Sequence, residues 1–245
     1  MLDWHSFRQA DTASVTREFV AHDFPIWLPH YHDLSDGQSG LDNPEGYRMV
    51  EFPIVNYTEA FILRHCPWLD EVVFQRLASA IVSVCGVGLL YLLILQVAQL
   101  PQSRQSQPVV LTPSHFCLAL TAAALTGFLP YAIYYGRTIL PEPHQITWAL
   151  SSLYFFVRFL RRPQAGEGIA ATVCLALACL IKPTSVFFGV VFLALALYRY
   201  GAKTLIKPSF YAIALSGLAP MLAWRQWITQ FPAGIPSSQI GRAHV

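Results

Sequence analysis

Long apolar runs separated by short polar connections make up most of the chain after about residue 72. Each run is long enough to cross, or nearly cross, a hydrocarbon core of ~30 Å. The six runs cover residues 72–97, 109 to about 134, 146–159, 169–181, 186–200 and 210 to about 227. The fourth run is short, and a break at Lys182 and Pro183 lets it form a hairpin with the fifth. The pattern predicts an all-α, polytopic helical bundle.

Residues 1–71 have a mixed apolar and polar composition and contain no apolar run of that length. Helical spacing predicts two amphipathic helices, at 12 to about 22 and at 56–65, with Phe19 and Phe61 on their apolar sides. Between them, the stretch HDLSDGQSGLDNPEGYR is rich in turn-forming residues and predicts a long loop. We therefore expect the two helices and the loop between them to form a platform that lies on the membrane surface.

Composition supports a membrane protein. The chain is 54% hydrophobic and 12% charged, whereas soluble domains carry about 25% charged residues. No dense basic stripe exists, which argues against a nucleic-acid partner. Four of the five cysteines lie in apolar runs without metal-ligand spacing, so we interpret them as small core residues. The expected organisation is a first loop at 1–71 and a bundle of about six spans at 72–239.

The distribution of lysine and arginine predicts the orientation. One set of alternate connections contains Arg104, Arg158, Arg161, Arg162, Arg199, Lys203 and Lys207. The opposite set contains Arg137, Lys182 and Arg225. Seven basic residues against three place the first set in the cytoplasm. Residues 1–71 would then be periplasmic. The bundle would be integral to a bacterial inner (plasma) membrane, and membrane lipids would be among its partners.

We expect the chain to be truncated at both ends. An outer N-terminal segment requires an odd number of earlier spans, of which one is the simplest case. The last six residues, IGRAHV, match one reading frame of a common sequencing-adapter oligonucleotide. We therefore expect 240–245 to be a non-native tail and exclude it from fold reasoning.

Asp11 and Arg8 are the first candidate site residues. The position of Asp11 before a predicted helix indicates an N-cap, and the same position also suits a general base at the membrane surface. Arg8 lies one turn earlier, where it can pair with Asp11 or hold an anionic head group, because its planar fork fits phosphate. Both interpretations remain open for each residue.

Further charged residues are predicted on the same outer side. His30, His32 and Glu51 offer ligands for a divalent metal ion, although surface loop histidines are common. The motif YYGRTILPEP contains Arg137 and Glu142, and LIKPTS contains Lys182. Charges at membrane depth are costly and often mark function, while long side chains can also extend to the interface.

The motifs HSFRQADTASVTREF, PIWLPH, EFPIVNY and GRTILPEP occur in this order. Together they resemble membrane glycosyltransferases of the GT-C class. The most similar group comprises bacterial relatives of the protein O-mannosyltransferases and of the lipid A aminoarabinose transferase. This resemblance implies transfer of a sugar from a polyprenyl-phosphate carrier to a lipid, glycan or protein acceptor outside the cytoplasm. It also implies that Asp11 occupies the place of the essential acid of the first outer loop. In EFPIVNY, Phe52 stands where the family has a basic residue.

The resemblance implies a glycosyltransferase that inverts the sugar carbon. Asp11 would act as the base, and Arg8, Arg137 and Lys182 would contact the phosphate. Glu51 and Glu142 would orient the acceptor, or Glu51 would bind a metal ion with His30. The alternatives are a transporter or flippase for a lipid-linked or anionic solute, and a non-catalytic membrane subunit of envelope assembly. A fragment of such an enzyme would be inactive if acceptor specificity depends on regions after residue 239.

Overall fold

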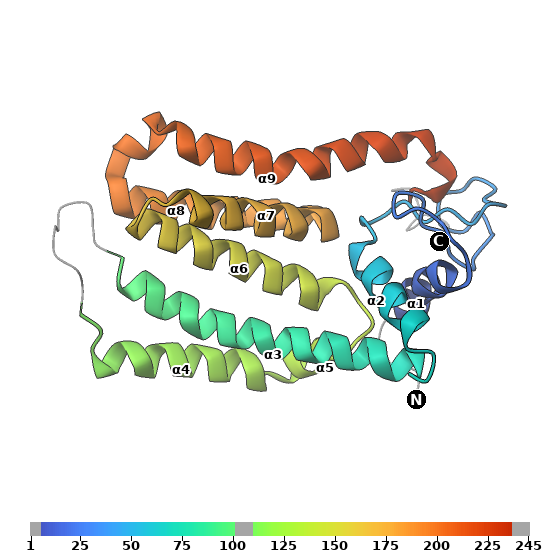
Figure 1. Cartoon of the computed structure of the whole chain (residues 1–245), viewed down its shortest axis with the longest axis horizontal. Coiled ribbons are helices and arrows are strands. Elements are labelled where there is room, and N and C mark those ends of the chain that lie inside the picture. Colours follow the sequence, from blue (N-terminus) through green and yellow to red (C-terminus); the bar gives the residue numbers. More distant parts are fainter. Residues whose placement is uncertain (1–5, 101–109, 237–245) are drawn as a thin grey trace, which may run out of the picture. The chain divides into compact units, whose positions relative to one another are not determined.

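The computed structural model describes residues 6–100 and 110–236, and this part of the chain consists of helices and connecting loops without a named strand (Figure 1). The prediction of an all-α protein is confirmed. Arg104, Val109 at the start of the second apolar run, and the tail at 240–245 lie outside the described residues. The chain divides into two compact units. The first comprises the residues up to Ser79, Thr138–Pro141 and the residues from Leu222; the second comprises Ala80–Arg137 and Glu142–Met221.

The first unit is built on helices α1, Ser6–Ala21, and α2, Ile54–His65. Its small core contains Val15 and Phe19 of α1 together with Ala60 of α2. Helices are present in both predicted segments, but α1 begins six residues earlier than the apolar pattern indicated. Over its whole length α1 has almost no separation of apolar and polar faces, so the amphipathic character expected there is wrong, whereas α2 is amphipathic. Their position on a membrane surface stays a prediction.

The long polar loop between these helices has a defined backbone path. His30 and Tyr47 form an isolated antiparallel bridge, and the N–H of Tyr31 donates to the carbonyl oxygen of Gly46 at 2.8 Å. Gly46 has φ of 64°, and a Cβ there would lie 2.6 Å from the Tyr31 carbonyl oxygen. Only glycine fits this close approach without strain. The turn fixes the position of Arg48, whose N–H donates to the carbonyl oxygen of Pro29 at 2.9 Å.

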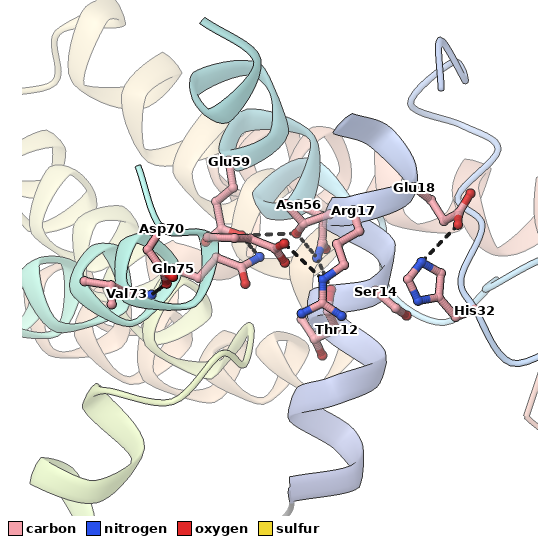
Figure 2. A network of polar contacts seen from close by, with 12 residues as sticks. Thr12, Ser14, Arg17, Glu18, His32, Asn56, Glu59, Asp70, Val73 and Gln75 are labelled. Atoms are coloured by element: carbon pink, nitrogen blue, oxygen red, sulfur yellow. Dashed lines mark hydrogen bonds and ion pairs between the residues drawn. The ribbon is translucent and has the colours of Figure 1, made fainter. Parts of the chain in front are cut away.

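A buried polar network joins α1 and α2 to the first turns of α3, Glu71–Ala98 (Figure 2). The carboxylate of Glu59 accepts hydrogen bonds from Thr16 Oγ1 at 3.3 Å and from Gln75 Nε2 at 3.1 Å. Asn56 donates from Nδ2 to Thr16 Oγ1 at 3.0 Å. Burial raises the pKa of Glu59 to about 7, against the lowering effect of the hydrogen bonds from Gln75 and Thr16.

The second unit is a helical bundle. It contains α3 from Ala80 onward and α9 (Pro208–Trp227) up to Met221. Its further helices are α4 (Pro113–Phe128), α5 (Pro130–Gly136), α6 (Glu142–Arg161), α7 (Ala165–Ile181), η1 (Pro183–Phe187), α8 (Phe188–Tyr200) and η2 (Gly201–Ile206). In Figure 1, α6 lies between α3 and α7. Its residues Phe156, Val157 and Leu160 form much of the apolar core. Thr147 ties α6 to α3 by donating to the carbonyl oxygen of Val82 at 3.0 Å.

Among the described helices, α3 and the segment Pro183–Ile206 are long and apolar enough to cross a membrane. The pair formed by α4 and α5 would give a third span, bent by 65° at the break before Pro130. These segments support an integral membrane protein, while the number of six spans stays a prediction. The expected break at Lys182 and Pro183 is confirmed, because α7 ends at Ile181 and η1 begins at Pro183.

We expect Glu59→Gln to remove a pH dependence of stability. The carboxyl is raised from an ordinary pKa of 4.5 to about 7 in the folded state, so wild type should lose stability as pH rises through that window. At pH 8 the variant should be more stable by up to about 3 kcal/mol. Thermal unfolding in detergent between pH 4 and pH 8, about the limits of this window, measures the difference.

The matched control is Glu45→Gln, because Glu45 is an exposed carboxylate of the polar loop. It should keep the wild-type pH dependence. An unchanged pH dependence in Glu59→Gln would show that Glu59 does not bind an additional proton on folding.

Candidate functional site

The Asp11 side chain lies beside Arg48 in the first unit. Asp11 Oδ2 and Arg48 Nη2 are 3.4 Å apart, and the two side chains are only 12% and 17% exposed. The expected N-cap role of Asp11 is wrong, because α1 begins at Ser6. The helix continues through this position, and the Ser14 hydroxyl donates to the Asp11 carbonyl oxygen at 2.7 Å. The Asp11 carboxylate therefore pairs with a distant cation.

The surroundings of Asp11 make its carboxylate more basic than a solvated aspartate. Burial raises the pKa of Asp11, the positive charge of Arg48 opposes this rise, and the negative charge of Asp33 adds to it. A carboxylate with a raised pKa accepts a proton more readily near neutral pH, which suits a general base. The Arg48 guanidinium also lies over the ring of Tyr31, 5.1 Å from its centroid.

Arg8 and Glu51 form a second ion pair between the same two segments. Arg8 Nη2 and Glu51 Oε1 are 3.3 Å apart. Arg8 and Asp11 are three residues apart on α1, so they share a face of the helix, and Arg48 and Glu51 have the same spacing in the loop. Two ion pairs therefore hold this loop segment against α1. In one pair α1 supplies the cation, and in the other it supplies the carboxylate. Both predicted residues of α1 belong to one candidate site, and Arg8 forms an ion pair with Glu51.

The structure does not bring His30 and Glu51 together as ligands of one ion. His30 stacks on Phe24 with ring centroids 4.0 Å apart, and its Nδ1 lies 2.6 Å from the carbonyl oxygen of Glu45. Within residues 6–100 and 110–236, no group of three His, Cys, Asp or Glu side chains is arranged to hold a metal ion. The divalent metal ion stays a prediction without a coordinating cluster among these residues.

A cavity of about 410 Å³ lies next to the Asp11 pair within the first unit. It is lined by aromatic rings and by the carboxylates of Glu18 and Glu45. His32 Nε2 lies 3.1 Å from Glu18 Oε1, and Figure 2 shows the two side chains pointing toward each other. Tyr31 lines the cavity and also lies under Arg48. Through these contacts the Asp11 pair is continuous with a polar, aromatic recess.

In the second unit, Glu142 and Lys182 meet as predicted members of one cluster. Lys182 Nζ and Glu142 Oε1 are 2.6 Å apart, with side chains 18% and 22% exposed. Glu142 begins α6, and Lys182 is the residue that directly follows α7. Arg137 follows α5 and is exposed. Next to the ion pair, Gln145 donates to Ser185 Oγ at 3.0 Å, which links α6 to η1.

Arg48 and Glu59 are the polar residues that the sequence interpretation missed. Arg48 had an available signal, since it is the sole lysine or arginine between Arg17 and Arg64 in a segment rich in acids. Such a cation is a natural partner for a buried carboxylate. Glu59 occupies an ordinary position in an amphipathic helix, and its spacing gave no sign of the contacts with Thr16 and Gln75.

Residues 115–227 match the family model described as dolichyl-phosphate-mannose-protein mannosyltransferase. The match runs from α4 to the end of α9 and covers just under half of the chain. Searches of curated proteins and of solved structures found no significant match. The family match confirms the resemblance to GT-C glycosyltransferases and supports a membrane enzyme that uses a sugar carried on polyprenyl phosphate. Arg137, Glu142 and Lys182 lie within the matched range, while Asp11 lies outside it.

We expect Glu142 and Lys182 to stabilise the fold only as a pair. Glu142→Gln or Lys182→Met leaves a largely buried charge without its counter-ion, so each single variant should cost about 1–3 kcal/mol. The double variant should cost less than the sum by at least about 1 kcal/mol. Unfolding of the four proteins in detergent measures this coupling. Additive losses, within about 0.5 kcal/mol, would contradict an energetic contribution of the pair.

Proposed function

We propose that the protein transfers a sugar from a polyprenyl-phosphate donor to a hydroxyl group of a lipid, glycan or protein acceptor. The transfer takes place at the outer, non-cytoplasmic face of the membrane that contains the protein. Asp11 is the general base of this reaction. The observation on which this role depends is the Asp11–Arg48 pair, a nearly buried carboxylate with a raised pKa beside a fixed cation. The family match supports the class of reaction, and the geometry of the first unit supports the choice of base.

The reaction needs a proton acceptor because the attacking hydroxyl group is a weak nucleophile. The acceptor proton moves to Asp11 as the hydroxyl oxygen forms a bond to the anomeric carbon of the sugar. The bond between that carbon and the phosphate oxygen breaks, and polyprenyl phosphate leaves with the electron pair. Attack from the face opposite the leaving group inverts the sugar carbon.

The departing phosphate gains negative charge, which cations stabilise in a site of low polarity. Arg48 and Arg8 lie on the same face of the first unit as Asp11 and are the cations that this geometry favours. Each already pairs with a carboxylate, so an incoming phosphate would compete with Asp11 or Glu51 for its guanidinium. Arg137 and Lys182 of the second unit stay predicted phosphate contacts.

The recess beside Tyr31 is the proposed place of the acceptor. Its volume of about 410 Å³ falls in the range of small-molecule sites. Aromatic rings and carboxylates offer a sugar or serine-like acceptor both an apolar surface and hydrogen-bond acceptors. Tyr31 and Arg48 connect this recess with Asp11. In this proposal Glu51 orients Arg8, while Glu142 orients Lys182.

We expect Asp11→Asn to reduce the rate of sugar transfer by about 10²–10⁴-fold, the usual contribution of a general base. Asparagine keeps the shape but cannot accept the proton, so donor binding should persist. Transfer from a labelled polyprenyl-phosphate sugar, measured in membranes that contain the complete gene product, gives the rate. Binding of the same donor is measured in parallel.

The matched control is Asp36→Asn, which neutralises an exposed aspartate of the polar loop between α1 and α2. It should leave the transfer rate unchanged. Transfer by Asp11→Asn at the wild-type rate would overturn the assignment of the base. Equal losses in both variants would show that the effect is one of charge and not of proton transfer.

A further inference from the structure

The second unit contains a cavity of about 390 Å³ at the end of α6 that is distant from Glu142. Every residue that lines it has a polar side chain. Three of them are the arginines Arg158, Arg161 and Arg162, which come from the last turn of α6 and the residue after it. The lining is completed by Gln96 of α3, by Gln99 just after α3, by Gln164 before α7, and by Glu167 in the first turn of α7. Three guanidinium groups in one recess favour binding of an anion.

One of the three arginines has its charge largely balanced within the protein. Arg158 Nη2 lies 2.6 Å from Glu167 Oε1, in the first turn of α7. Arg161 donates a hydrogen bond to the amide oxygen of Gln96, which is neutral. Arg162 is exposed, and no described side chain forms an ion pair with it. The cavity therefore retains an excess of positive charge that is centred on Arg161 and Arg162.

The backbone at this end of the bundle favours an anion as well. Helix α7 begins at Ala165, and its N-cap residue Gln164 makes no side-chain hydrogen bond to the first turn. The free N–H groups of a helix start carry partial positive charge and suit phosphate oxygens. Arginine adds a planar fork of donors that matches phosphate geometry. Side chains and helix start thus favour the same ligand chemistry.

This cavity is separate from the proposed catalytic residues of the second unit. Glu142 opens α6 and Arg161 closes it, and the 20 residues between these limits extend over about 30 Å. Gln96 lines the same cavity and lies near the C-terminal end of α3, which is long and apolar enough to cross a membrane. We therefore expect the arginines at the level of lipid head groups, at the end of α6 opposite to the Glu142–Lys182 pair. Basic recesses between membrane helices are known to hold anionic lipid head groups.

We propose that the cavity lined by Arg158, Arg161 and Arg162 binds a phosphate group, either in an anionic lipid head group or as free phosphate. Arg161 and Arg162 contact the phosphate oxygens directly. Glu167 holds Arg158 in place through the ion pair between α7 and α6. An occupied cavity ties α3, α6 and α7 together, because each of these helices contributes to its wall or rim.

The alternative is a general attraction between basic loops and an anionic bilayer, without a defined site. Lys203 of η2 provides the matched control, since it is an exposed cation in the set of basic connections predicted on the same side as these arginines. It does not line the cavity. Removal of Lys203 lowers the general attraction by the same charge as removal of Arg162.

The experiment is a binding titration of the purified protein in a neutral detergent, with native mass spectrometry as the readout. One arm uses phosphatidylglycerol, and the other uses inorganic phosphate. The proteins are wild type, Arg162→Gln, the double variant Arg161→Gln/Arg162→Gln, and Lys203→Gln. Thermal unfolding without ligand checks that each variant is folded, and the exposed position of Arg162 makes its single variant the safe comparison.

We expect saturable binding of one equivalent by wild type and by Lys203→Gln, with affinity at least about tenfold lower in Arg162→Gln because a charge-assisted contact is lost. Saturation by phosphatidylglycerol alone identifies a lipid head group, and saturation by inorganic phosphate alone identifies free phosphate. Binding that does not saturate in either arm would overturn the proposal. A loss in Lys203→Gln equal to that in Arg162→Gln would overturn it as well.

Discussion

The ion pair between Asp11 and Arg48 is the interaction on which the candidate site of the first unit depends. Two charges that are nearly buried must compensate each other, because removal of either one would leave the other without water or a counter-ion. The pair fixes the polar loop against α1, and the Arg8–Glu51 pair repeats this crosslink one turn away. The same burial that makes the pair necessary also raises the pKa of Asp11. Structural and chemical roles thus come from one cause.

The backbone of the loop is shaped to allow this pair. Gly46 adopts a conformation that side chains rarely accept and lets the chain approach Tyr31 closely. Asn43 then bridges to Tyr47 through two hydrogen bonds with its backbone, at 2.9 and 3.0 Å. Arg48 follows immediately and reaches Asp11. A segment rich in turn-forming residues is therefore held by hydrogen bonds where it contributes the side chain that pairs with Asp11.

The sequence predicted the helices well because apolar periodicity decides where they form. The break at Lys182 and Pro183 was also predictable, since proline cannot continue a helix. The early start of α1 at Ser6 was not, because the stretch before residue 12 is polar. Gln9 is buried there and accepts a hydrogen bond from the N–H of Ile139 at 3.3 Å. Contacts between residues so far apart in sequence leave no local pattern.

Contacts between distant segments also limited which site residues could be predicted from the sequence. Position and side-chain chemistry pointed to Asp11, Arg8 and Glu51, and the motif resemblance added roles for them. The pairing of Asp11 with Arg48 follows from the path of the loop in three dimensions. Glu142 and Lys182 were predicted from separate motifs but on the same outer side. They meet because the first residue of α6 lies beside the residue that follows α7. The family match supports the class of enzyme through residues 115–227. The proposed role of Asp11 as a base is supported by the geometry of the first unit alone.

The most direct measurement of the central claim is to follow both halves of a labelled polyprenyl-phosphate sugar in membranes that contain the complete gene product. The account predicts that polyprenyl phosphate is released in equal amount with a new glycosidic product on the acceptor. Appearance of the intact donor on the other membrane leaflet, without any glycosidic product, would contradict it and indicate a transporter.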